Sequence, residues 1–309
     1  MLLRKLITFC LFTAISFSAQ AQDCDRSCLA GFLDQYLNAI IANDASQAPL
    51  SYGFRQTENS IVTPNDEGLW SSVTAMGKLE RRYYDPEGSS AGFYGLLEEN
   101  GERAVVSLRL KVNNNMITEA EWHVGRENDL GLQGVPGTVY WDADNLIANP
   151  PNEGAVPLNR RYSRDDLIAI ANSYFDGIIA QNSKVIKGHP GCSRRENGQD
   201  TFGGPLAEGA TGYNGTSDCR TSGDFGLAQV AARRVQVVDV EQQIAMLSVV
   251  FLRRPGNERW RNHFTEVFSI EDGLIRHVHA AMFYARPNQP VPNWPPYDGN
   301  FPLTPNAAE

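Results

Sequence analysis

Two stretches of the chain share one pattern of apolar and polar positions. Apolar residues recur at helical spacing across 29–41 and again across 167–179. Beyond the first predicted helix, apolar and polar residues alternate along 106–112, which is typical of a strand with one buried face. Asn113-Asn114-Asn115 and Glu271-Asp272-Gly273 predict tight hairpin turns. The pattern therefore predicts a helix followed by strands joined in hairpins, twice over.

The two stretches also share residues at constant separations. Residues 31–59 align without gaps with residues 169–197, at an offset of 138, and later matches follow at offsets of 154 and 158. The growing offset places about 20 extra residues in the second copy, mostly within the Gly-rich stretch 197–228. The matches are Tyr36 with Tyr174, Glu58-Asn59 with Glu196-Asn197, Asp85 with Asp239, and Val112 with Ile270. Such self-similarity predicts a duplicated unit.

A helix followed by hairpins predicts an α+β fold, with helices on one face of a curved antiparallel sheet. A stretch rich in Pro and Asn predicts a linker between the copies, and a tail of interleaved Pro and aromatic residues predicts an extended segment packed along a domain surface. The expected divisions are a signal peptide over 1–21, a first domain over 22–148, a linker over 149–160, a second domain over 161–286 and a tail over 287–309.

The first 21 residues have the features of a secretory signal peptide. Arg4 and Lys5 precede a short apolar run over 6–17, and Ala19-Gln20-Ala21 forms a small-x-small cleavage site. The apolar run is too short to span a bilayer, and no other stretch of the sequence is suited to do so. We therefore expect a secreted or periplasmic protein.

The charge of the chain opposes two classes of partner. Its formal net charge is −9 at pH 7, and loss of Arg4 and Lys5 with the signal peptide makes the remainder more acidic. Nucleic acids and anionic membranes require a cationic surface. We therefore expect neither as a partner.

Four cysteines follow the predicted signal peptide: Cys24, Cys28, Cys192 and Cys219. An even number in an oxidising compartment predicts two disulfides. Of the three possible pairings we favour Cys24–Cys28 and Cys192–Cys219, because each closes a local feature of its own domain. A zinc site is the alternative, but one C-x3-C pair with two distant cysteines is a weak metal pattern. We expect no metal and no cofactor.

Several segments of the sequence resemble known proteins. Residues 36–44 and 115–121 resemble the nuclear-transport-factor-2-like, or SnoaL-like, fold. That resemblance implies two tandem cone-shaped domains, each a curved antiparallel sheet wrapped around helices with a pocket inside. The whole mature chain also resembles a family of secreted fungal and bacterial proteins of unknown function, through residues 57–59, 67–70, 109–112, 189–198 and 234–239. The wider fold includes both enzymes and binding modules, so it implies no single activity.

Two Glu-Asn pairs, Glu58-Asn59 and Glu196-Asn197, are the first candidates for a site. An arginine lies close to each in sequence, Arg55 in the first copy and Arg194 in the second. A guanidinium would keep a pocket carboxylate ionised and able to bind or deprotonate a polar ligand. The alternative is structural, with Glu and Asn fixing a loop to the sheet by hydrogen bonds to the backbone.

Two histidines, His277 and His279, alternate on a predicted strand, so both side chains project from one face. In the first copy their counterparts are acids, and His123 follows them. Imidazoles suit general acid–base chemistry near neutral pH, which makes this pair a catalytic candidate. The alternatives are a metal site with His263 as third ligand, and a solvated polar face.

Trp70 and Tyr83 are candidates to line an apolar pocket, although aromatic residues at such positions more often form plain core. The sequence contains no Gly-x-Ser-x-Gly elbow, phosphate loop, dinucleotide fingerprint or His-Glu-x-x-His motif. We interpret the chain as an exported small-molecule-binding protein whose two domains form an intramolecular pseudo-dimer. The alternatives are a cofactor-independent acid–base enzyme of the isomerase, dehydratase or hydrolase type acting in one pocket, and a duplication that serves oligomerisation or surface display. An enzyme would require a titratable group buried beside an oxyanion donor, and a binder an apolar cavity with only neutral polar groups.

Overall fold

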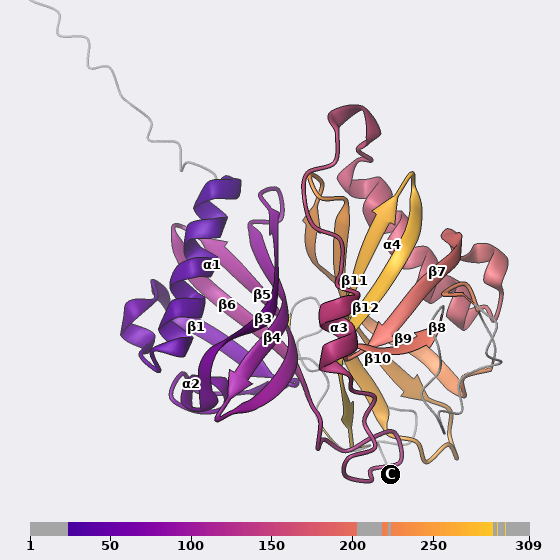
Figure 1. Ribbon diagram of the computed structural model, residues 1–309, viewed down its shortest axis with the longest axis horizontal. Coiled ribbons are helices and arrows are strands. Elements are labelled where there is room, and N and C mark those ends of the chain that lie inside the picture. Colours follow the sequence, from indigo (N-terminus) through magenta and orange to yellow (C-terminus); the bar gives the residue numbers. More distant parts are fainter. Residues whose placement is uncertain (1–23, 203–217, 222–223, 287–288, 290–293, 295–309) are drawn as a thin grey trace, which may run out of the picture.

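The computed structural model describes residues 24–202, 218–221, 224–286, 289 and 294. The predicted signal peptide, most of the predicted tail and much of the Gly-rich stretch lie outside these residues. The described chain is α+β, with two six-stranded sheets in two tandem domains that lie side by side (Figure 1). Within these ranges no helix is long and apolar enough to cross a membrane.

The first domain begins with a helix, α1 (Arg26–Ile41), and a short 3-10 turn, η1 (Ala45–Gln47). Its strand order is β2-β1-β6-β5-β4-β3. A one-turn helix, α2 (Leu69–Ser72), precedes the long strand β3. The strands are β1 (Leu50–Glu58), β2 (Ile61–Val62), β3 (Val73–Asp85), β4 (Ser90–Glu99), β5 (Glu102–Asn113) and β6 (Met116–Arg126).

The second domain repeats this arrangement with α4 (Arg164–Ile179), η3 (Ser183–Val185) and the strand order β8-β7-β12-β11-β10-β9. Two short helices, α3 (Ala143–Ala148) and η2 (Leu158–Arg160), connect the domains. The identical strand order confirms the predicted duplication. The strands are β7 (Gly188–Glu196), β8 (Gln199–Phe202), β9 (Leu227–Asp239), β10 (Ile244–Arg253), β11 (Arg261–Glu271) and β12 (Leu274–Ala285).

Each sheet contains one parallel strand pair, which the predicted antiparallel sheet lacked. Strands β3 to β6 follow one another through hairpins and are therefore antiparallel. Strand β1 pairs with β6, the last strand of its domain, and runs parallel to it; β7 and β12 do the same. This long-range pairing has no local sequence signal, because it depends on how the whole unit closes.

Both predicted hairpin turns are confirmed. Strand β5 ends at Asn113 and β6 begins at Met116, while β11 ends at Glu271 and β12 begins at Leu274. Asn114 and Asn115 have φ of 50° and 56°, a left-handed conformation that Asn tolerates better than most residues. Both predicted disulfides, Cys24–Cys28 and Cys192–Cys219, are also present.

The central strands are buried on both faces. On β4, Phe93 and Leu97 belong to the core under α1, whereas Tyr94 and Leu96 belong to a cluster shared with the second domain. Successive side chains of a strand alternate between faces, so one face of β4 packs against the helix and the other packs against the neighbouring sheet. Strand β5 was predicted to be half-buried. Its polar residues Ser107 and Arg109 are buried as well, because the second domain covers them.

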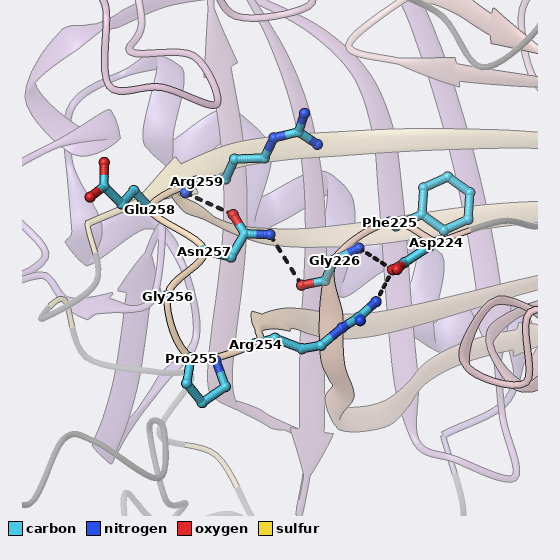
Figure 2. Close-up of a pocket in the computed structure, with 9 residues that line it drawn as sticks. All are labelled: Asp224, Phe225, Gly226, Arg254, Pro255, Gly256, Asn257, Glu258 and Arg259. Atoms are coloured by element: carbon cyan, nitrogen blue, oxygen red, sulfur yellow. Dashed lines mark hydrogen bonds and ion pairs between the residues drawn. The ribbon is translucent and has the colours of Figure 1, made fainter.

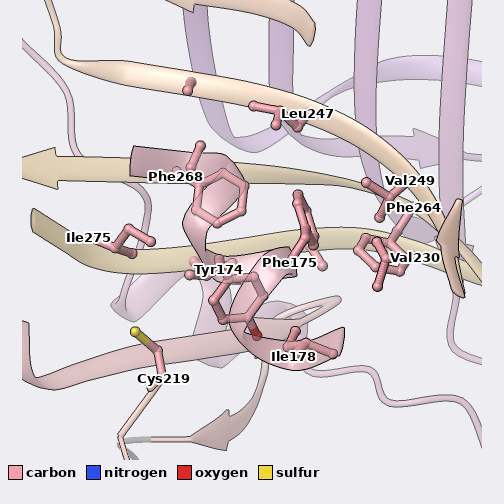
Figure 3. Close-up of a cluster of buried hydrophobic side chains, with 14 of the residues drawn as sticks. Tyr174, Phe175, Ile178, Cys219, Val230, Leu247, Val249, Phe264, Phe268 and Ile275 are labelled. Carbon is pink, nitrogen blue, oxygen red and sulfur yellow. The ribbon is translucent and has the colours of Figure 1, made fainter. Parts of the chain in front are cut away.

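The core of the second domain centres on aromatic residues from the helix and the sheet (Figure 3). Tyr174 and Phe175 of α4 both meet Phe268 of β11 edge-on, with ring centroids 5.6 Å apart. Edge-to-face packing of this kind adds to the free energy of burial. The predicted correspondence places Tyr174 where Tyr36 stands in the first core, and Tyr36 is likewise fully buried.

The two domains exchange equivalent contacts across their interface. Arg26, at the start of α1, pairs with Asp239 (2.8 Å), and Arg164, at the start of α4, pairs with Asp85 (2.9 Å). Asp239 also accepts a hydrogen bond from the backbone of Tyr84 (2.9 Å), and Asp85 accepts one from Val238 (3.0 Å). The offsets of 138 and 154 from the sequence relate each contact to its counterpart. Such reciprocity is what a two-fold interface requires.

The connection between the sheets contacts both domains. Asp144 of α3 pairs with Arg103 of the first sheet (2.6 Å), while Asn145 donates to the carbonyl of Gly198 in the second (2.7 Å). Further along, the backbone amide of Val156 donates to Glu241 (2.8 Å). Residues 143–148, assigned to the first domain from sequence, therefore bridge the two. The linker contacts both as well, since Arg81 of β3 donates to the carbonyl of Pro151 (2.9 Å).

Candidate functional site

The asparagines of the two Glu-Asn pairs hold equivalent backbone positions. The Asn59 side chain donates to the carbonyl of Val124 and accepts from its amide, at 3.0 and 2.8 Å. Asn197 does the same with Met282, at 2.9 and 2.8 Å. Both asparagines have positive φ, 49° and 44°. This geometry is the structural alternative that the sequence left open, and it fixes the correspondence of β6 with β12.

Neutral side chains fill the interior of the first domain. Gln56 accepts hydrogen bonds from the Tyr36 hydroxyl (2.5 Å) and the Trp70 indole (2.7 Å). Trp122 donates in turn to Tyr36 (3.2 Å). These four side chains are nearly inaccessible to solvent. Trp70, a predicted ligand contact, is thus engaged in a hydrogen-bonded core.

Charged side chains occupy the corresponding interior of the second domain. The repeat offset places Arg194 at the position of Gln56. Strand register pairs Leu108 with Trp122 in the first domain and Glu266 with Ala280 in the second. A bulky indole and an isobutyl group are therefore replaced by a methyl group and a carboxylate. The two domains share a topology but differ in what fills them.

Arg194 links two carboxylates in this interior. Its Nε and Nη2 lie 3.0 and 2.9 Å from Oε1 of Glu266, and its Nη1 binds Oε1 of Glu196. The Tyr284 hydroxyl donates to the other oxygen of Glu196 (3.2 Å). Arg194, Glu196 and Glu266 are 5%, 8% and 0% exposed. Removal of such charges from water is costly unless each is well paired.

Glu266 is incompletely paired. Within the described residues its Oε2 has no hydrogen-bond partner, although that atom is buried. Burial raises the pKa of Glu266 to about 7, against the opposing effect of the Arg194 charge. The carboxyl group can therefore hold or release a proton near neutral pH, and its free oxygen can donate or accept a hydrogen bond.

Glu58 has a different arginine partner from the one its sequence neighbours suggested. It pairs with Arg126 of β6 (2.9 Å) and accepts from the backbone amide of Leu69 (3.0 Å). Arg55 instead lies over the Trp294 ring, 4.9 Å from its centroid. Strand β1 projects successive side chains to opposite faces, and an offset of three residues separates Arg55 from Glu58. The predicted pairing was wrong for Glu58 and right for Glu196 with Arg194.

His277 and His279 share a face of β12, as predicted, with ring centroids 6.1 Å apart. His277 bonds to the Ser193 hydroxyl (2.8 Å), and His279 bonds to the backbone carbonyl of Asn149 (2.9 Å). Burial lowers the pKa of both, that of His279 to about 3. Alternation along β12 places them on the opposite face from Ala280, and hence away from Glu266.

The remaining predicted residues lie between the domains. His123 bonds to Thr265 of the second domain (3.0 Å), and burial lowers its pKa to about 4. Tyr83 is buried in the shared apolar cluster. His263, the possible third metal ligand, bonds to Ser60 (3.0 Å) instead. In the described part of the chain no group of three potential ligands could hold a metal ion.

The surface grooves are weaker candidates for a functional site than the interior of the second domain. One groove, of about 710 Å³, lies at loops 224–226 and 254–259 (Figure 2). Its polar groups bond to one another, as when Asp224 binds both Arg254 and the amide of Gly226. A second groove of about 460 Å³ brings Glu58 and Asn59 next to Phe283 and Tyr284. The first groove lacks a buried unpaired polar atom among the residues that the structure describes.

Sequence reasoning missed Glu266, the central residue of the candidate site. The offset of 158, applied to Leu108, points to Glu266 and would have revealed an acid at a core position. A carboxylate in place of a buried leucine is the signal of a functional or tightly paired residue.

Comparison with known families supports a domain assignment without an activity. Residues 160–282 match the model of a family described as a domain of unknown function (DUF8021). The match covers most of the second domain, including Arg194, Glu196 and Glu266. No curated protein matches the chain.

Proposed function

We propose that the protein is an exported small-molecule-binding protein whose ligand occupies the interior of the second domain and contacts Glu266. The free oxygen of Glu266 is the observation that carries this proposal, because a buried polar atom without a partner costs free energy that a ligand would recover. A polar molecule with a hydroxyl, amide or amine group would complete the pairing.

The difference between the two interiors supports this assignment. Trp70 and Trp122 fill the first, so it has little room for a ligand, whereas Ala280 stands at the position of Trp122 in the second. The first copy has its own cluster, Arg126 with Glu58 and Glu99, but it is more exposed than that of Arg194, Glu196 and Glu266. A more deeply buried cluster in one copy is what we expect where duplication has left one copy structural and the other functional. The described interiors therefore differ in charge as well as in the size of the side chains at these positions.

The resemblance to cone-shaped SnoaL-like domains fits the proposal, since such domains hold their pockets between sheet and helix. The two disulfides are typical of proteins in an oxidising compartment, which supports export. The reciprocal contacts of Asp85 and Asp239 support the domains acting as an intramolecular pseudo-dimer. Nucleic acid and membrane are not among the proposed partners.

An acid–base enzyme that needs no cofactor is the second candidate, and Glu266 favours it, because a buried titratable group is what we expected of an enzyme rather than of a simple binder. A carboxyl with a pKa of about 7 is suited to take up and return a proton at neutral pH. Arg194, held by Glu196, would place a positive charge beside any negative charge that develops on a substrate. The site then performs the same binding and adds one proton transfer at Glu266 Oε2.

Native mass spectrometry of the mature chain purified from its own host tests the binding proposal. We expect wild-type protein to retain a small molecule, and Glu266→Leu to lose it. That substitution copies Leu108 of the first domain and leaves the Arg194–Glu196 pair intact. Glu58→Gln is the matched control, because it alters an arginine-paired carboxylate in the first domain only, and it should retain the molecule.

Retention of the same molecule by Glu266→Leu would refute the proposal, because it would place the ligand elsewhere. If Glu58→Gln also lost the molecule, the ligand would be assigned to the first domain.

A further inference from the structure

We propose a second binding site, for a small organic acid, in the groove between the two domains. The groove has a volume of about 310 Å³, within the range of small-molecule sites. Strand β5 of the first domain forms one wall, and β9 and the start of α4 form the other. It therefore exists only while the domains are docked. Four cations and two carboxylates line it: Arg109, Lys111, Arg164, Arg234, Asp85 and Glu119.

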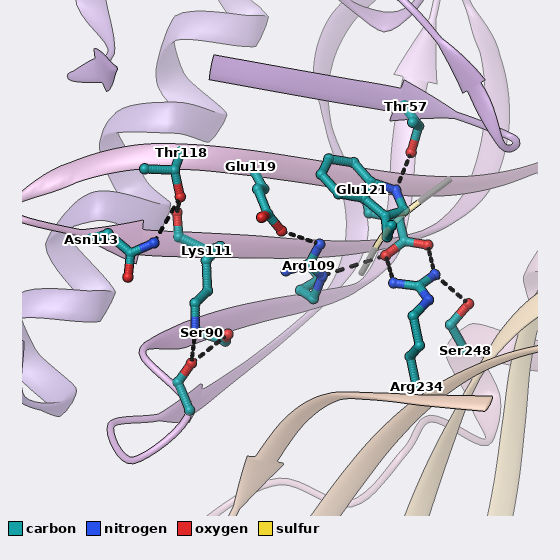
Figure 4. A network of polar contacts seen from close by, with 12 residues as sticks. Thr57, Ser90, Arg109, Lys111, Asn113, Thr118, Glu119, Glu121, Arg234 and Ser248 are labelled. Carbon is teal, nitrogen blue, oxygen red and sulfur yellow. Dashed lines mark hydrogen bonds and ion pairs between the residues drawn. The ribbon is translucent and has the colours of Figure 1, made fainter. Parts of the chain in front are cut away.

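Most of these charges are paired. Arg109 binds Glu119 (2.7 Å), and Arg164 binds Asp85 (2.9 Å). Arg234 crosses the interface to Glu121, a third carboxylate directly behind the groove (2.7 Å) (Figure 4). After this pairing one positive charge is left over, that of Lys111.

The Lys111 ammonium has no carboxylate partner within the described residues. Its one hydrogen bond goes to the carbonyl of Gly88, at 2.6 Å (Figure 4). The side chain is half-buried, and burial lowers the pKa of Lys111; the charge of Arg109 lowers it further, while Glu119 and Asp85 act in the opposite direction. In a chain with a formal net charge of −9, a partly desolvated cation without a paired carboxylate is unusual. A bound anion would neutralise the charge of Lys111.

Two hydrogen-bond donors of residues that line the groove also lack acceptors, although neither nitrogen is itself exposed. Nε of Arg234 and Nε2 of Gln236 have no partner in the described structure, and their residues are 7% and 3% exposed. An oxyanion is an acceptor only, and so suits the Lys111 ammonium, which is a donor only. A single carboxylate matches the single excess charge, so we assign the site to molecules with one carboxylate group.

Binding of acetate to the mature chain, followed by amide chemical shifts at constant ionic strength, tests the site. We expect saturable shifts at residues 88–90, 109–111 and 234–236. Lys111→Met should weaken binding at least about tenfold, the loss expected for one charge-assisted hydrogen bond. Lys184→Met, which removes an exposed lysine of η3, should bind as wild type does.

The outcomes separate this site from the one at Glu266. Glu266→Gln should bind acetate normally, so failure of either proposal leaves the other standing. Shifts that do not saturate, or shifts that saturate equally in Lys111→Met, would overturn the acetate site. Because the wild-type shifts locate the anion on their own, the test holds even if Lys111→Met is poorly folded.

Discussion

Glu266 combines two properties that a purely structural residue would not need. It is fully buried, and one of its carboxyl oxygens has no partner within the described structure. Arg194 offsets part of the cost, but Glu196 shares the same guanidinium. A leucine at this position, as in the first domain, would avoid the cost altogether. The proposed ligand would account for retaining a group with this cost.

Stability against pH should reveal that cost. The pKa of Glu266 is raised in the folded protein to about 7, from 4.5. Between these values the folded state holds a proton that the unfolded state has released, so this group's contribution falls as pH rises from 4.5 to 7. Glu266→Gln mimics the protonated form. We expect its free energy of unfolding to match wild type at pH 4.5 and to exceed it at pH 8 by on the order of 3 kcal/mol.

Denaturant titrations of both proteins at the two pH values measure this difference. Equal stabilities at pH 8 would show that the ionised carboxylate is not destabilised in the fold. Glu58→Gln serves as comparison, since Glu58 pairs with Arg126 at a partly exposed position in the first domain.

At the scale of elements, local signals were sufficient for much of the fold. Helical spacing located α1 and α4, asparagine and glycine runs located the hairpin turns, and the cysteine spacing gave both disulfides. Contacts between elements that are distant in the sequence could not be predicted from such local signals. The parallel pairing of β1 with β6, and of Glu58 with Arg126 rather than Arg55, depends on strands that meet only after the unit closes.

The turn that follows β7 should depend on its asparagine. The Asn197 side chain forms hydrogen bonds to the carbonyls of Met282 and Tyr140 and to the amide of Met282. Asn197→Ala leaves these buried groups unpaired. We expect a loss of about 2–4 kcal/mol in unfolding free energy, measured by chemical denaturation.

Asn59→Ala is the matched control for this turn in the first domain. Asn59 is only partly buried and its side chain bonds to Val124 alone, so the expected loss is smaller, about 1–2 kcal/mol. An equal loss in both variants would show that burial of the second turn adds nothing.

At the scale of the whole molecule, packing of the two domains decides which polar residues are buried. Sequence alternation predicted exposed faces on β5, yet the second sheet covers Ser107 and Arg109. His123 and His263 are buried at the same interface, where each bonds to a residue of the other domain. Burial of histidines between domains links domain docking to pH.

We expect acid to weaken this interface. The folded pKa of His123 is lowered to about 4 from 6.5, and that of His263 is also well below its usual value. Below pH 6.5 the unfolded chain takes up protons that the folded chain refuses, so this stability is complete above pH 6.5 and is lost as pH falls toward 4. Of the unfolding free energy lost over this range, His123 alone accounts for on the order of 3 kcal/mol. Glu266 acts with the opposite sign, so Glu266→Gln is the proper background.

Thermal unfolding from pH 7 to pH 4 in that background measures the effect. His123→Gln should flatten the decline, whereas His189→Gln, which lies outside the interface, should leave it unchanged. If thermal stability falls equally steeply with pH in His123→Gln, His123 does not cause the loss.

The most direct test of the proposed site is the titration of the Glu266 carboxyl carbon by NMR in the mature chain, assigned by comparison with Glu266→Gln. We expect the midpoint of this titration to lie near pH 7 and to shift when the molecule retained from the host is present. A midpoint near 4.5, unaffected by that molecule, would mean that Glu266 is an ordinary solvated carboxylate and that the second domain holds no such site.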